Sequence, residues 1–228
     1  MENSTLSKEV QHHGFSWEKD ILRNVFQVSD EEIKQINYTS KMDLPSAYNR
    51  VDHVDVSIKT SCSANAVCMA DCLRIYDAVA SGNPFHLLVV HYKQDDSTNT
   101  KKLTGIVQVD LTNTVSLLFG TITREEISTL DKVIKEVPQK RKPTEEEYDK
   151  IYTLRNELQK KSGALHLDPK CNSQQSRLQC SFNRFQEFLQ KNPTKIIAQS
   201  QTNQFRGANL LSEIQSSRRV FKKNQIQN

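Results

Sequence analysis

Residues 51–77 combine a lysine with acidic side chains in a way that suits phosphodiester hydrolysis. The sequence VDVSIK alternates apolar and polar residues, so we expect a strand that carries Lys59 on its polar face. Asp71 follows Lys59 by twelve residues, near the start of an apolar-periodic run. A lysine and carboxylates that meet at a strand end can hold a divalent cation and activate water. This segment is therefore the first candidate for a catalytic centre.

Three aspartates compete as the acid beside Lys59. Asp43 precedes Ser57 by fourteen residues, a spacing that permits a hairpin in which Asp43 lies alongside the strand. Asp55 shares a face with Lys59, but roughly 13 Å separates the two positions along an ideal strand. Asp52 is the third candidate. We rank Asp43 first, Asp55 second and Asp52 third.

Other chemistries have less support in the sequence. His91 and Lys93 alternate on a further apolar stretch and form a weaker rival for the lysine site. The five cysteines include no CxxC pair, and Cys171 and Cys180 lack the spacing of zinc ligands. The six glycines form no GxxxxGK phosphate loop. Zinc chemistry and ATP dependence are therefore not expected.

The pattern around this segment predicts a single domain over residues 1–228. Helices are expected over 14–27, 30–36, 64–80, 124–136, 145–161 and 182–191, with strands over 54–59, 84–92, 103–111 and 115–119. Residues 37–50 should form a strand and a turn, and residues 195–201 a strand or a short helix. Ser16 is a plausible N-cap of the first helix, with Glu18 and Asp20 in its first turn. Thr123 and Thr144 are expected to cap the two later helices.

This order of elements resembles the α-β-β-β-α-β order of the PD-(D/E)XK nucleases. Over roughly residues 14–120 the chain is similar to a small type II restriction endonuclease of that superfamily. The resemblance implies an α/β fold with a restriction-endonuclease-like core, in which helices flank a central mixed sheet. A helical, basic elaboration is expected at the C-terminal end, with DNA contacts over roughly 161–228.

In that superfamily two acids bind Mg²⁺, and the lysine of a (D/E)-x-K tripeptide orients or activates the attacking water. The tripeptide here is Ser57-Ile58-Lys59, so the usual second acid is missing. In some restriction enzymes the carboxylate has moved to the following helix, and Asp71 fits such a position. The resemblance thus implies Lys59, Asp43, Asp71 and Asp55 as catalytic residues, with the three aspartates as Mg²⁺ ligands.

Plainer interpretations of the same residues stay open. Asp71 suits a carboxylate at a helix N-terminus, where the helix dipole favours negative charge. Lys59 suits a strand-edge lysine that pairs with Asp55 or Asp71. Each of these roles would be structural rather than catalytic.

The charge is distributed unevenly along the chain. Residues 170–228 contain ten Lys or Arg against two Glu, a net charge of +8, which leaves −4 for the other 169 residues. The basic residues are interleaved with Asn, Gln, Ser and aromatic residues. This pattern is typical of a polyanion-binding surface. A basic tail that binds no partner would have the same sequence pattern.

Residues 170–184 are the best candidates for reading bases, because Asn and Gln pair with adenine and Arg with guanine. The candidate DNA-binding residues are Lys170, Asn172, Ser173, Gln174, Gln175, Arg177, Gln179, Arg184, Arg218 and Arg219. Lys170, Arg177 and Arg184 would add phosphate contacts. Arg218, Arg219, Lys222 and Lys223 also suit phosphate contacts, which give affinity without sequence choice. An ordinary polar loop is the alternative for residues 170–184.

The sequence therefore predicts a Mg²⁺-dependent, site-specific endodeoxyribonuclease of the restriction-modification type that cuts double-stranded DNA. A homodimer is expected, because two strands must be cut and a palindromic site matches a two-fold axis. The chain has no apolar run long enough to span a membrane and no recognisable signal peptide, so a cytoplasmic, reducing location is expected. One alternative is a non-enzymatic nucleic-acid-binding protein that works through its basic C-terminal quarter. Another is a nuclease of repair or of RNA without sequence preference, which the amide-rich residues 172–181 favour less.

Overall fold

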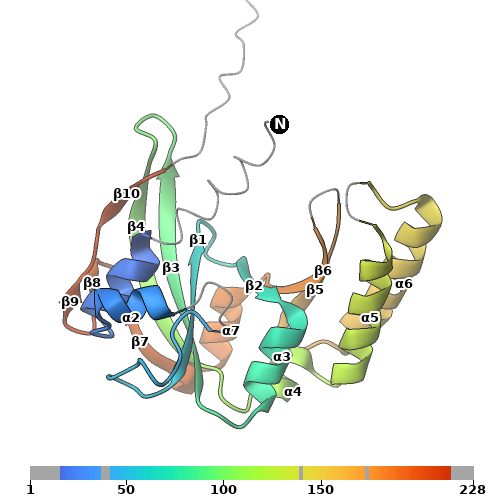
Figure 1. Cartoon of the computed structure of the whole chain (residues 1–228), viewed down its shortest axis with the longest axis horizontal. Helices are drawn as coiled ribbons and strands as arrows, with labels where there is room; N and C mark the ends of the chain where they lie inside the picture. The colour runs from blue at the N-terminus through green and yellow to red at the C-terminus, as the bar shows by residue number, and fades with distance from the viewer. Residues whose placement is uncertain (1–15, 37–41, 139–140, 173–174, 217–228) are drawn as a thin grey trace, which may run out of the picture.

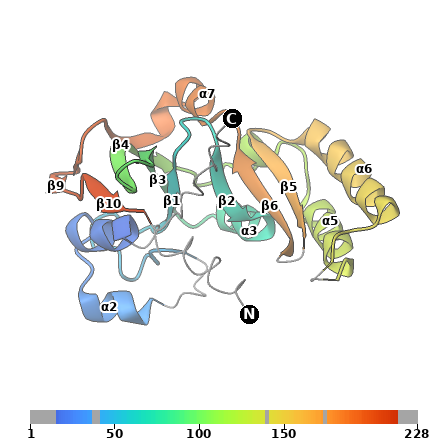
Figure 2. The ribbon, with the colours of Figure 1, turned by 90° about the horizontal axis from the view of Figure 1, so that it is seen from above.

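The protein has an α/β fold in which helices flank a mixed, curled central sheet (Figures 1 and 2). The computed structural model describes residues 16–36, 42–138, 141–172 and 175–216. Within these ranges no helix combines the length and the apolar character that crossing a membrane requires.

The central sheet contains the lysine strand at one edge. Its order is β1 (Asp55–Ser61), β3 (Phe85–Asp95), β4 (Thr100–Asp110) and β10 (Glu213–Gln215), and β7 (Ile196–Ser200) also pairs with β4. β1 and β3 are parallel, whereas β3 and β4 form an antiparallel hairpin. A parallel pair needs a crossover connection, which the chain between β1 and β3 provides. The strands expected over 54–59, 84–92 and 103–111 are confirmed with small shifts in their ends.

A second sheet stands beside the edge of the first. Its order is β2 (Val67–Asp71), β6 (Ser176–Phe182) and β5 (Leu165–Cys171), all antiparallel. The helix expected over 64–80 is therefore wrong in its first half, because α3 begins only at Cys72 (Cys72–Ala80). Val67 and Met69 are fully buried on one face of β2, and pairing with β6 selects the strand in place of another helical turn.

Only α5 and α6 begin at the caps that the sequence predicts, whereas Ser16, expected as an N-cap, already lies within helix 16–24. The helices span 16–24, α2 (Asp30–Gln35), α3, α4 (Val115–Phe119), α5 (Arg124–Glu136), α6 (Glu145–Lys161) and α7 (Phe185–Lys191). Thr123 and Thr144 each form a capping box with the glutamate three residues later, which satisfies the exposed amides of the first turn. The strand expected over 115–119 is wrong, because this stretch forms α4, a short helix that Gly120 ends.

A helical C-terminal elaboration is not confirmed. Between α6 and residue 216, the described residues form α7, a 3-10 turn (Pro193–Lys195) and the strands β5, β6, β7, β8 (Gln204–Phe205), β9 (Ala208–Asn209) and β10. Leu178, Cys180 and Phe182 alternate with the polar Gln179 and Ser181, and this apolar–polar period of two is the pattern of a strand. The helix expected over 182–191 accordingly starts later, at Phe185.

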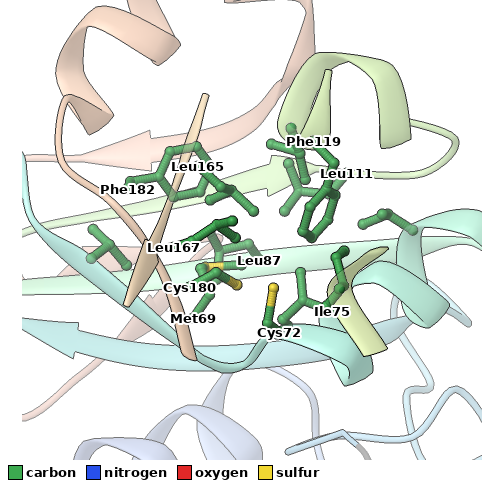
Figure 3. Close-up of a cluster of buried hydrophobic side chains, with 14 of the residues drawn as sticks. Met69, Cys72, Ile75, Leu87, Leu111, Phe119, Leu165, Leu167, Cys180 and Phe182 are labelled. Atoms are coloured by element: carbon green, nitrogen blue, oxygen red, sulfur yellow. The ribbon is translucent and has the colours of Figure 1, made fainter. Parts of the chain in front are cut away.

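Two apolar cores lie on opposite faces of the central sheet. One joins Leu87 and Val89 of β3 to α3, α5 and the second sheet, as Figure 3 shows for part of the cluster. The other joins Leu88 and Val90 of β3 to helix 16–24, whose Trp17 is almost fully buried. Because the first part of β3 is buried on both faces, its sequence is mostly apolar and does not alternate with polar residues.

Backbone contact at Gly120 generates the first prediction. Gly120 has φ 63° and ψ −119°, a region that glycine alone adopts readily, and a Cβ there would lie 2.0 Å from the Lys161 carbonyl oxygen. We expect Gly120→Ala to lower the free energy of unfolding by more than about 2 kcal/mol in denaturant titrations.

The matched control is Gly82→Ala. Gly82 also has positive φ (76°), but an added Cβ would meet nothing within 4 Å. We expect this variant to lose only about 1 kcal/mol, from backbone strain alone. Equal losses in the two variants would contradict the close contact between the ends of α4 and α6.

Candidate active site

Asp43 and Lys59 form the centre of the candidate site. Asp43 Oδ2 lies 2.8 Å from Lys59 Nζ, and it also accepts hydrogen bonds from the Ile58 amide (2.7 Å) and the Ser57 hydroxyl (3.0 Å). One carboxylate oxygen thus contacts all three residues of the Ser57-Ile58-Lys59 tripeptide. Lys59 Nζ donates in addition to the Ile58 carbonyl at 3.1 Å.

A short antiparallel bridge places Asp43 next to the tripeptide. Leu44 and Val56 exchange both backbone hydrogen bonds, at 2.8 and 2.9 Å, along the outer edge of β1. Leu44 is fully buried in the same core as Val56, so apolar burial fixes the register of this bridge. The hairpin that the spacing predicted is confirmed, and it brings Asp43 rather than Asp52 or Asp55 to Lys59.

Glu18 is a second acid whose ionisation responds to the charges of Asp43 and Lys59, and it was not expected here from the sequence. It lies in helix 16–24, beside the buried Trp17 and one turn before the buried Ile21. The pKa of Glu18 is raised from 4.5 to about 7, first by burial and then by the Asp43 charge, against the opposing charges of Lys59 and Lys19. These interactions show that Glu18 lies within electrostatic reach of both members of the central pair.

A sequence signal for Glu18 existed. The apolar stripe of helix 16–24 includes Trp17 and Ile21, and Glu18 lies at the border of that stripe. From the sequence, Glu18 was expected only as a first-turn residue of the helix. A carboxylate at the border of a buried face is held close to the sheet, whereas one on the outer face is not.

Asp55 and Asp71 are engaged elsewhere. Asp55 Oδ1 accepts a hydrogen bond from the Ser46 amide at 2.7 Å. Asp71 is the N-cap of α3 and accepts from the Arg74 amide at 2.8 Å. Neither carboxylate forms an ion pair with Lys59 in the described part of the chain. The observed contact of Asp71 is therefore the plainer one considered from the sequence.

Asp52 belongs to a separate polar network. Its two oxygens pair with the guanidinium of Arg206, and the Gln108 amide donates to it at 3.1 Å. Burial would raise the pKa of Asp52, but the hydrogen bonds from Arg206 and Gln108 lower it below its usual value. This network ties the β8–β9 turn to the segment before β1.

His91 and Lys93 do not form a second lysine centre. The His91 ring packs against Phe185 with 6.0 Å between ring centroids, and burial lowers the pKa of its imidazole. Lys93 is exposed on the same strand. Neither has a carboxylate partner among the described residues, in contrast to Lys59.

The candidate DNA-binding residues gather mainly on one hairpin. Lys170, Asn172, Gln175, Arg177 and Gln179 all lie in or beside β5 and β6, and Asn172 and Gln175 exchange backbone hydrogen bonds where these strands end. Arg184 lies at the N-terminus of α7, where its side chain is 82% exposed. Ser173, Gln174, Arg218, Arg219, Lys222 and Lys223 are outside the described residues.

Asp43, which contacts Lys59, and Glu18, whose pKa responds to both charges, are the carboxylates that could contribute to a cation site. No group of three or more His, Cys, Asp or Glu side chains suited to a metal occurs within the four described ranges. Mg²⁺ commonly uses only one or two protein carboxylates and completes its shell with waters and phosphate oxygens. Asp43 and Glu18 are a donor set of that size and type.

Comparisons of the chain with protein-family models, with curated proteins and with solved structures find no match.

The raised pKa of Glu18 predicts how stability depends on pH. The folded state retains the Glu18 proton between pH 4.5 and about 7, where the unfolded state has already lost it. The Glu18 carboxyl therefore leaves the free energy of unfolding unchanged below pH 4.5. Between pH 4.5 and about 7 it lowers that free energy progressively. Because 2.5 pKa units correspond to about 3 kcal/mol, we expect Glu18→Gln to raise stability by up to this amount at pH 8.

Denaturant titrations at pH 5 and pH 8 measure this difference, with Glu32→Gln as the matched control. The pKa of Glu32 is lowered to about 2, first by its hydrogen bond with Arg50, so its charge stabilises the fold above pH 4.5. Glu32→Gln should therefore lose stability at pH 8, opposite to Glu18→Gln. A Glu18→Gln variant with the same stability relative to wild type at both pH values would refute the buried position of Glu18.

Proposed function

We propose that this protein is a Mg²⁺-dependent endonuclease of double-stranded DNA that works in the manner of the PD-(D/E)XK nucleases. The observation that supports the proposal is the contact of Asp43 Oδ2 with Lys59 Nζ at 2.8 Å, on the edge strand that carries the tripeptide. The bridge between Leu44 and Val56 pairs the acid-bearing segment with the lysine strand, which is the relation that the resemblance implies.

The proposal assigns the second acid to Glu18 in place of Asp71 and Asp55. Asp71 and Asp55 each accept a backbone amide at another place in the fold. Glu18, in contrast, interacts electrostatically with Asp43 and Lys59 and has no hydrogen-bond or ion-pair partner among the described residues. A half-buried carboxyl without a partner is the kind of group that a cation would stabilise in its charged form.

Asp43 and Glu18 would hold the metal ion. Asp43 Oδ2 already accepts three donors, and Oδ1 accepts none from the described residues, so this second oxygen is available to a cation. When bound, Mg²⁺ supplies charge neutralisation for the phosphate and activation of the attacking water. Because burial raises the pKa of Glu18 to about 7, metal binding below that pH also releases a proton.

Lys59 acts directly on the reacting groups in this proposal. Two of its three ammonium protons are directed to Asp43 and to the Ile58 carbonyl. The third is left for a phosphate oxygen or for the attacking water. A positive charge fixed before the substrate binds stabilises the charge that develops on the phosphate without further reorganisation.

Sequence specificity and a homodimer are part of the same proposal. The amide-rich and basic residues on β5 and β6 support specificity, because such side chains suit base edges better than phosphates alone. A dimer follows from the need to cut both strands of a symmetric site.

Plasmid cleavage tests the catalytic proposal. We expect wild-type protein to convert supercoiled DNA into discrete linear fragments only when Mg²⁺ is present. Lys59→Ala should lower the cleavage rate at least about 100-fold, because it removes the ammonium group that pairs with Asp43. Lys150→Ala, which removes a lysine 57% exposed on α6, should leave the rate unchanged.

Cutting that continues without metal, or at the wild-type rate in Lys59→Ala, would refute the proposed centre. A smear that requires Lys59 would support the chemistry and refute sequence specificity. Retarded DNA without any cutting would instead favour the non-enzymatic binding protein.

Metal binding can be measured without any cleavage. We expect Mg²⁺ at about ten times its Kd to stabilise the wild-type protein by about 1.4 kcal/mol in thermal unfolding at pH 7.5. Asp43→Asn and Glu18→Gln should each abolish most of this increment, because each removes a proposed ligand. Asp55→Asn and Asp71→Asn should retain it, and loss of the increment in these two controls alone would return the metal to the sites first expected from the resemblance.

A further inference from the structure

The hairpin of β5 and β6 ends in a two-stranded ribbon. β2 pairs with β6 only from Gln179 onward, whereas β5 pairs with β6 as far as Cys171 and Ser176. Beyond β2 the hairpin therefore continues as two strands, closed by mutual backbone hydrogen bonds between Asn172 and Gln175. In both views this hairpin and the β3–β4 hairpin lie on opposite sides of β1 (Figures 1 and 2).

α5 holds the ribbon rigidly from one side. The buried Asp131 accepts the Leu178 amide at 2.9 Å, and the Ser176 hydroxyl donates to the Ile134 carbonyl at 2.6 Å. The edge amide of Leu178, which β2 no longer reaches, is thus satisfied by a helix side chain. A covered edge neither frays nor pairs with another strand.

The opposite face of the ribbon is polar and basic. Lys170 and Arg177 are direct cross-strand neighbours, and both alternate with the residues that point into the core. The guanidinium of Arg177 lies between two glutamines: Nη2 is 3.4 Å from Gln175 Oε1. With its amide oxygen turned toward Arg177, Gln179 accepts from Nε at 3.1 Å and from Nη2 at 2.8 Å.

Two acidic residues lie opposite Gln179, Asp71 on β2 and Asp168 on β5, and both are already engaged; Asp71 accepts the Arg74 amide at 2.8 Å. Asp168 accepts the Ser181 hydroxyl at 2.6 Å and contacts His166 Nδ1 at 2.9 Å. Arg177, by contrast, has only neutral amides around its guanidinium in the described structure. Its positive charge therefore stays uncompensated and is held in a fixed orientation.

A duplex of DNA fits this combination of shape and chemistry. The major groove of B-DNA, about 12 Å wide, admits a two-stranded ribbon, whereas the major groove of A-form RNA is too narrow for side chains to read. Arginine recognises the O6 and N7 atoms of guanine with two hydrogen bonds, and glutamine recognises adenine in the same way.

We propose that the end of the β5–β6 ribbon enters the major groove of duplex DNA, where Arg177, flanked by Gln175 and Gln179, reads a guanine. This inference rests on the proposed function, since it names how the same protein selects the DNA that it cuts. Lys170 contacts the phosphates beside the groove. Arg177 is accordingly a specificity-determining residue and has no part in the cleavage step.

Selection from a pool of duplexes with a randomised centre tests the ribbon, with Ca²⁺ in place of Mg²⁺. We expect wild-type protein to enrich a guanine-containing motif. Arg177→Lys keeps the charge but loses the two-pronged contact, so its preference for the motif should fall about 10- to 100-fold while its affinity for unrelated duplex stays unchanged. Binding should also protect the motif guanine from methylation at N7 in wild type and not in Arg177→Lys.

Arg184→Ala is the matched control. This arginine is highly exposed but lies outside the ribbon, so its loss should weaken binding to the motif and to unrelated duplex equally. An unchanged motif preference in Arg177→Lys, no enriched motif in wild type, or equal competition by double-stranded RNA would each overturn the inference.

The two proposals fail separately. Discrimination that depends on Arg177 in a protein that never cuts DNA would support the ribbon and refute the nuclease. Cleavage that depends on Lys59 but is indifferent to Arg177→Lys would support the nuclease and overturn the ribbon.

Discussion

The outer edge of β1 is the constraint on which the candidate site depends. An edge strand exposes backbone amides that need partners, and an unsatisfied buried amide costs about 1–3 kcal/mol. Here the bridge to Leu44 satisfies part of the edge, and the Asp43 carboxylate satisfies the Ile58 amide at 2.7 Å. The same oxygen then fixes Lys59 at 2.8 Å. Asp43 Oδ2 thus satisfies an edge amide of the sheet and also forms the ion pair with Lys59.

The apolar core beneath helix 16–24 keeps a third charged group in this place. Raising the pKa of Glu18 to about 7 implies that its ionised form is disfavoured by about 3 kcal/mol. Burial of a single large apolar side chain contributes about 1.5–3 kcal/mol, and Trp17, Ile21 and Phe26 are all buried from this part of the chain. Apolar burial of these side chains therefore outweighs the free energy lost by ionising Glu18 in a poorly solvated position. The Glu18 carboxyl stays within electrostatic reach of Asp43 for this reason.

In the proposals, the central sheet carries the catalytic residues and the second sheet carries the DNA-reading residues. The central sheet is buried on both faces and holds the charged groups at its edge, so their positions are rigid. The second sheet has one apolar face against α3 and α5 and one polar face, which suits contact with a charged partner. Asp131 joins the two functions structurally, because it anchors the ribbon to a helix that packs in the larger core.

Local signals in the sequence determined much of the secondary structure. The period of two in VDVSIK and the capping boxes at Thr123 and Thr144 act within a few residues, so β1, α5 and α6 formed as expected. The basic and amide-rich character of residues 170–184 was also evident, because composition does not depend on the fold.

Only the tertiary structure decided which acid meets Lys59 and where the chain between β1 and α3 becomes a strand. Asp43, Asp52 and Asp55 were all candidates from the sequence, and the burial of Leu44 beside Val56 selected Asp43. Residues 67–71 were compatible with a helix until β6, more than a hundred residues later, offered a strand to pair with. Glu18 joined the site because its helix packs on the sheet. Contacts between distant segments made each of these choices, and a local pattern does not encode the energy of such contacts.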